Sequence, residues 1–121
     1  MFGFPPLPPA QGLHPLIVHL PIGILAIAWV PMLMGLLCRK HRSGLFLSGL
    51  IILALGTLSL FAATFTGEAA EEYVEHSVQY STQAIDYALH EHEELGESIR
   101  IIFVGIFALY AIALLLHHKL P

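Results

Sequence analysis

The chain has 121 residues, of which 56% are hydrophobic and only 12% are charged. This balance is too apolar for a soluble domain of this length, so the sequence predicts an integral membrane protein. The single cysteine, Cys38, excludes an intramolecular disulfide and any paired-cysteine site for zinc or haem attachment. A bound metal would therefore have to be held by histidine and carboxylate side chains.

The charges are separated along the chain. All nine acids lie between Glu68 and Glu97, and three of the five bases lie in the turn Arg39–Arg42. Basic residues beside membrane spans are retained in the cytoplasm. We therefore expect this turn and the C-terminus to be cytoplasmic, with the N-terminus and the acidic segment outside. The charge pattern offers no patch for nucleic acid, so no nucleic-acid partner is expected.

Residues 1–12 contain four of the eight prolines and are predicted to form an extended arm. Residues 13–121 then form a single membrane domain. A helix needs about 20 apolar residues to cross the hydrocarbon core of a bilayer. Three segments meet this requirement, at about 16–38, 44–65 and 99–117.

The extracytoplasmic segment 66–98 keeps apolar residues at helical spacing. We expect a short separate helix over Gly67–His76 and a second helix that begins near Ser81 and continues into the third span. That third helix would be about 54 Å long at 1.5 Å per residue, and its first third would project from the membrane. The predicted fold class is all-α, a membrane helical bundle of three transmembrane helices plus a short extracytoplasmic helix.

Two histidines lie where a polar ring is costly, His19 one turn inside the first span and His92 on an apolar stripe of the third helix. Ionisable side chains in membrane helices usually face the protein interior. Gly23 lies four residues after His19, and Gly96 lies at the same spacing from the second histidine. Paired imidazoles with small neighbours are typical of bis-histidine haem b, although such glycines also serve plain helix packing. We predict haem b held by these two histidines, with His14 as a third candidate or a neighbouring group.

Carboxylates beside these histidines keep a second interpretation open. Imidazole with carboxylate suits non-haem iron, zinc, copper or manganese, and helical bundles build such sites from Glu and His on facing helices. The candidate ligands are His14, His19, Glu68, Glu72, His92 and Glu93. The plain alternative for the glutamates is a solvated acidic rim, expected above all for Glu71, Glu75, Glu91 and Glu94.

A third interpretation is a cofactor-free structural subunit. Its acidic outer surface would dock a basic partner such as a soluble cytochrome. The non-haem metal site could be redox-inert or catalytic, so the sequence does not decide whether the chain is an enzyme; a non-catalytic electron-transfer or metal-binding subunit is the leading expectation.

The run at 13–23 reads Leu-His-Pro-Leu-Ile-Val-His-Leu-Pro-Ile-Gly. It resembles the opening signature His-Pro-x-x-Val-His-Phe-Pro-Ile of a bacterial membrane-protein family known only as a domain of unknown function, DUF2231. Two further marks of that family follow in order, a Thr-Gly-Glu at 66–68 and a His-Glu at 92–93. The resemblance covers roughly residues 13–116.

Relatives in this family are joined to Rieske iron–sulfur or c-type cytochrome modules. The resemblance therefore implies electron transfer in the bacterial inner membrane, with a Rieske or cytochrome partner. The chain departs from the signature at Leu20, and it ends after a third span where many relatives have a fourth. An open flank would then be covered by a second copy or by another subunit of a redox complex, and lipid would contact the remaining surface.

Overall fold

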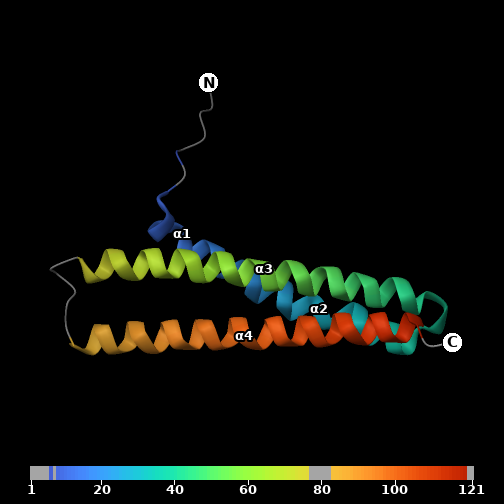
Figure 1. Ribbon diagram of the computed structural model, residues 1–121. Helices are drawn as coiled ribbons and strands as arrows, with labels where there is room; N and C mark the ends of the chain where they lie inside the picture. Colours follow the sequence, from blue (N-terminus) through green and yellow to red (C-terminus); the bar gives the residue numbers. More distant parts are fainter. Residues whose placement is uncertain (1–5, 7, 77–82, 120–121) are drawn as a thin grey trace, which may run out of the picture.

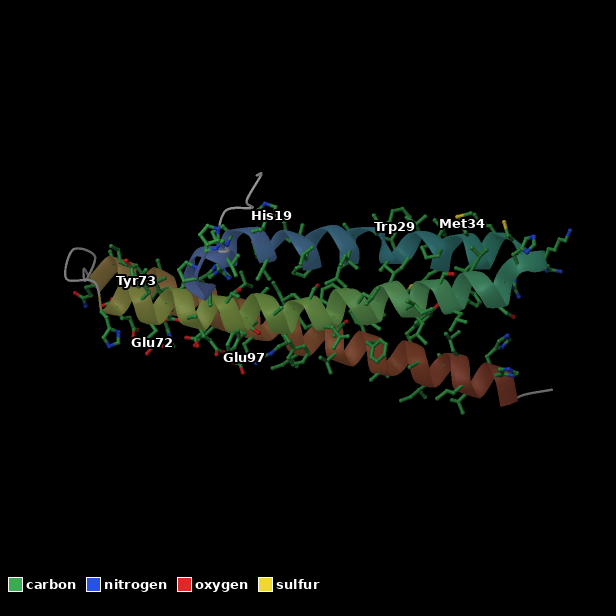
Figure 2. The ribbon with its side chains drawn as sticks, turned by 90° about the horizontal axis from the view of Figure 1, so that it is seen from above. His19, Trp29, Met34, Glu72, Tyr73 and Glu97 are labelled. Atoms are coloured by element: carbon green, nitrogen blue, oxygen red, sulfur yellow. The ribbon has the colours of Figure 1, made fainter. Side chains whose placement is uncertain are left out.

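The computed structural model describes residue 6, residues 8–76 and residues 83–119. These residues form helices and no strands, in the order α1 (Ala10–Ile17), α2 (His19–Leu37), the short 3-10 turn η1 (Arg39–His41), α3 (Arg42–Glu75) and α4 (Gln83–Lys119). α3 and α4 run side by side along the length of the molecule (Figure 1). Viewed from above, α3 lies between α2 and α4 (Figure 2).

Three stretches are long and apolar enough to cross a membrane, Gly12–Leu37, Arg39–Glu75 and Gln83–His118. The predicted all-α fold with three membrane-spanning helices is therefore confirmed. The first stretch combines α1 and α2. Because α1 begins at Ala10, the last residues of the predicted arm 1–12 are helical.

The first span bends between its two helices because of a proline. Pro21 has no N–H to donate to the carbonyl of Ile17, so the helical ladder is interrupted there. Val18 nevertheless keeps right-handed helical angles (φ −60°, ψ −25°), and its N–H donates to the His14 carbonyl at 3.0 Å. The chain therefore changes direction without leaving the span.

The separate short helix predicted over Gly67–His76 is instead the outer end of α3, which runs unbroken to Glu75. No proline lies in this stretch, and one glycine costs a helix only about 1 kcal/mol relative to alanine, which is too little to end it. α4 likewise continues through Gly96 without a break. Its predicted start near Ser81 lies outside the described residues.

The two long helices exceed the thickness of a bilayer. With 34 and 37 residues, α3 and α4 are about 51 and 55 Å long, against a hydrocarbon core of about 30 Å. Both extend past α1 at the end that carries the acids (Figure 1). We call residues 67–75 and 83–97 the acidic end. It projects from the membrane as a pair of helices.

One face of α3 forms the centre of the bundle. Its buried residues recur mainly at steps of three or four and are Gly49, Leu53, Gly56, Thr57, Leu60, Ala63 and Thr66. On α2, Gly35 lies so close to α3 that a Cβ there would be 2.7 Å from the Phe46 ring. Among the described residues α1, α2 and α4 all pack on α3, whereas α4 packs on neither α1 nor α2.

Polar contacts attach α4 to α3. The Arg100 guanidinium donates from Nη1 to Thr64 Oγ1 at 3.1 Å and lies 5.4 Å from the centre of the Phe61 ring. Near the other end, the Tyr110 hydroxyl donates to the Phe46 carbonyl at 3.1 Å. Two hydrogen bonds so far apart fix the position of α4 along α3.

We expect Gly35→Ala to lower the midpoint of thermal unfolding in detergent. The added methyl group meets the Phe46 ring, and overpacking of this kind costs about 1–3 kcal/mol. Gly105→Ala is the matched control, because its Cβ would meet nothing within 4 Å and alanine favours a helix. Equal midpoints for the two variants would contradict the close α2–α3 packing.

Candidate functional site

His14 points from α1 toward α3. Its Nδ1 lies 3.1 Å from the Ala63 carbonyl oxygen and 3.3 Å from Thr66 Oγ1. A carbonyl can only accept a hydrogen bond, so in the neutral ring Nδ1 carries the proton and donates to Ala63. The other ring nitrogen, Nε2, then keeps its lone pair and can accept a proton donor or bind a metal.

Thr66 and Gly67 of α3 are the residues against which this imidazole packs. The Thr66 hydroxyl lies within 3.1 Å of the carbonyls of Ala62 and Ala63, donates to them, and presents a lone pair to His14. A Cβ on Gly67 would lie 3.1 Å from His14 Cε1. Threonine therefore supplies an acceptor, and glycine supplies the space in which the ring lies against the helix.

His92 of α4 is exposed and not buried as its place on the apolar stripe predicts, and its ring lies beside that of His14. The two ring centroids are 6.1 Å apart, and the ring planes are perpendicular. One turn further along α4, Gly96 leaves open space, since the nearest atom to a Cβ there would be Thr64 Cγ2 at 4.0 Å. Two imidazoles from different helices thus meet beside two glycines.

Both histidines line a groove of about 820 Å³, a volume within the range of about 300–1,000 Å³ typical of cofactor sites. α3 forms its floor, and its walls come from α1 and α2 on one side and α4 on the other. The α4 wall contains the predicted stripe of the third helix from Leu89 to Phe103 together with the charged residues Glu93, Glu97 and Arg100. The polar mouth lies at the acidic end, and the interior is apolar.

The structure does not bring His19 to His92, so the predicted pair is not formed. His19 is exposed, donates from Nδ1 to the Pro15 carbonyl at 2.5 Å, and lies on the side of the first span that faces away from α3 and α4 (Figure 2). The reason is helical geometry, because five residues turn its side chain about 140° from that of His14. Gly23 also faces open space, with nothing within 4 Å of a Cβ.

The predicted six-residue metal site is not assembled either. Glu68 and Glu93 line the groove, but Glu72 is exposed on the outer part of α3 (Figure 2). Among the described residues, no group of three or more His, Cys, Asp or Glu side chains is arranged to hold a metal ion. His90 lies outside the groove and pairs with Glu94 at 3.2 Å.

Two groove residues were missed by sequence reasoning. Glu71, expected in the solvated rim, is only partly exposed and lines the groove four residues after Gly67. Arg100 also lines it, with a quarter of its side chain exposed, and lies 3.5 Å from Glu97. The available signals were the helical spacing of Glu71 from Gly67 and the position of Arg100 as the first base after the acids, at the start of the third span.

The pKa of Glu71 is raised above its ordinary value of 4.5. Burial is the largest cause, because it penalises the charged carboxylate. The neighbouring acids Glu93, Glu75 and Glu68 also raise the pKa, whereas His90 lowers it. The mouth of the groove therefore holds a carboxyl group whose charged form is disfavoured, which raises its pKa.

A family described as a predicted membrane protein (DUF2231) matches residues 10–119. The chain belongs to this family. The matched residues include all four helices and the groove, so the whole site lies inside the family domain. No curated protein and no solved structure matches the chain. The family description gives no activity, and the groove itself is the basis for a functional assignment.

We expect Glu71→Gln to raise the midpoint of thermal unfolding at pH 8. A carboxyl whose pKa is raised by folding destabilises the folded state above that pKa, and the penalty disappears below its ordinary value of 4.5. The gain should therefore vanish at pH 4. Glu72→Gln, at an exposed position one residue away, is the control and should show no such pH-dependent gain. A gain of equal size at both pH values would contradict the raised pKa.

Proposed function

We propose that the chain is an electron-transfer subunit that binds haem b between His14 and His92. The observation that carries the proposal is the facing pair of imidazoles, with centroids 6.1 Å apart. Two imidazoles on opposite sides of one iron, each bound at about 2 Å, would have centroids roughly 6 Å apart. The spacing of the pair therefore suits a single metal between the two rings.

The number of histidines favours haem over a bare metal ion. A porphyrin supplies four nitrogens to its iron, so two axial imidazoles complete the coordination. Protein sites for bare transition metals use three or four protein ligands. Two opposed imidazoles therefore meet the requirement of haem directly.

The surroundings of His14 also fit a metal ligand. Metal-binding histidines almost always donate their other ring N–H to a carbonyl, a carboxylate or water, which fixes the ring and makes the ligand more basic. The bond from His14 Nδ1 to the Ala63 carbonyl has this arrangement. Gly67 gives the His14 ring its place against α3, Gly96 leaves room for a flat macrocycle, and apolar residues such as Phe103 would exclude water from its faces.

The charge pattern supports an orientation for this subunit. The basic turn Arg39–Arg42 would lie in the cytoplasm of a bacterium, and the acidic end would face the outside of the inner membrane. The haem would then lie near the outer surface. The acids around it would attract a basic redox partner, such as a soluble cytochrome or a Rieske protein, within a homo-oligomer or a larger complex.

The test is an absorbance spectrum of the protein purified in detergent from its native membrane, oxidised and then reduced with dithionite. We expect a Soret band and sharp reduced α and β bands. His14→Ala and His92→Ala should each abolish these bands, because each removes one axial ligand. His19→Ala is the matched control and should retain them, since this ring lies outside the groove.

Two results would contradict the proposal. A colourless sample that contains stoichiometric iron, zinc, copper or manganese would indicate a non-haem metal instead. Bands that survive His14→Ala but disappear in His19→Ala would restore the pair expected from the sequence.

A further inference from the structure

A second cavity, of about 440 Å³, lies at the end of the bundle opposite the acidic end. It is formed at the turn between α2 and α3. Its lining includes four consecutive basic or ionisable side chains and two serines, namely Arg39, Lys40, His41, Arg42, Ser43 and Ser48. The haem proposal uses none of these residues, so this cavity has to be explained separately.

No acidic side chain of the chain lies near the cations of this cavity. All nine acids of the chain lie between Glu68 and Glu97, at the far end of the molecule. Among the described residues the ion pairs join only His90 to Glu94 and Arg100 to Glu97. The turn therefore carries uncompensated positive charge.

A hydrogen bond to α2 holds the Arg42 side chain of this basic turn in place. Its Nε donates to the Gly35 carbonyl of α2 at 3.1 Å, so the guanidinium is fixed against the adjoining helix. The two terminal nitrogens are the part of the guanidinium that binds phosphate or carboxylate in a forked geometry. A guanidinium fixed through Nε loses less conformational freedom when it binds an anion.

Exposed apolar residues lie within a few positions of these cations along the chain. Leu37, the last residue of α2, is 75% exposed, and Arg39 follows two residues later. On α3, Leu47 is 54% exposed within two turns of the basic turn. An anion with acyl chains would contact both surfaces, whereas free phosphate would contact only the charges.

We propose that this cavity binds the phosphate of an anionic phospholipid, through Arg39, Lys40 and Arg42, with the lipid chains against α2 and α3. Clusters of Lys and Arg beside a membrane helix recognise anionic lipids, and each such cation strengthens binding about fivefold. The site serves to hold a lipid at the face of the membrane opposite the haem groove. It is independent of the proposed electron transfer.

The test is native mass spectrometry of the full chain in detergent, titrated with phosphatidylglycerol or with phosphatidylcholine of the same acyl chains. We expect one phosphatidylglycerol to bind at least tenfold more tightly than phosphatidylcholine. Arg39→Gln should weaken its binding about fivefold, and Arg39→Gln with Lys40→Gln about 25-fold. Within the part of the chain that the structure describes, neither residue forms a hydrogen bond like the one that joins Arg42 to Gly35, so the fold should be retained.

Lys119→Gln is the matched control, because it removes one base from the end of α4 and should change lipid affinity by less than twofold. Three results would overturn the proposal. One is equal affinity for the two lipids, and another is an equal loss in Arg39→Gln and Lys119→Gln, which would indicate bulk charge only. The third is displacement of phosphatidylglycerol by millimolar inorganic phosphate, which would indicate a free anion as the ligand.

Discussion

The close approach of α2 to α3 is the constraint on which the rest of the structure depends. Within lipid there is no hydrophobic force to press helices together, so small residues that allow close van der Waals packing take over that role. Gly35 on α2 and Gly56 on α3 both lie where a Cβ would overlap the facing helix. Because α1 and α4 also pack on α3, the glycine contacts determine where the walls of the groove stand.

The imidazole of His14 is attached to α3 without disturbing that helix. A backbone carbonyl has two lone pairs, and only one is used in the helical ladder. The Ala63 carbonyl can therefore accept the proton of His14 Nδ1 while it keeps its bond within α3, and the Thr66 hydroxyl, which lies near both carbonyls, can donate to Ala62. The outcome is a ring whose position and protonated nitrogen are both set by backbone, a more rigid support than a mobile side chain would provide.

Much of the fold could be predicted from the sequence, because apolar length and helical periodicity are properties of consecutive residues and need no knowledge of tertiary contacts. Apolar length located the three spans, and the 3.6-residue period located the groove-facing stripe of α4 from Leu89 to Phe103. The prediction of a separate helix at Gly67 was wrong, because one glycine does not end a helix when the residues before and after it are helical. α3 is helical on both sides of Gly67.

The site was predicted less well, because it depends on the rotation of one helix against another. Both histidines of the opening motif are polar rings near one end of a span, and nothing local distinguishes them. The residues that determine which histidine faces α3 are 52 positions further along the chain, where Thr66 and Gly67 provide an acceptor and a space for His14. Glu71 was likewise placed in the solvated rim, because its place in the groove depends on how α4, which supplies the neighbouring Glu93, lies against α3.

The groove also differs from an aqueous active site in how a ligand reaches it. α2 and α4 both pack on α3 but not on each other, so the groove is open on the side opposite its floor. Its inner part, lined by residues such as Leu25, Ile99 and Phe103, lies in the apolar spans, whereas its outer part lies at the acidic end. A hydrophobic ligand that enters through the inner part would arrive by lateral diffusion within the membrane plane, and its occupancy would follow its mole fraction among the lipids and not its concentration in water.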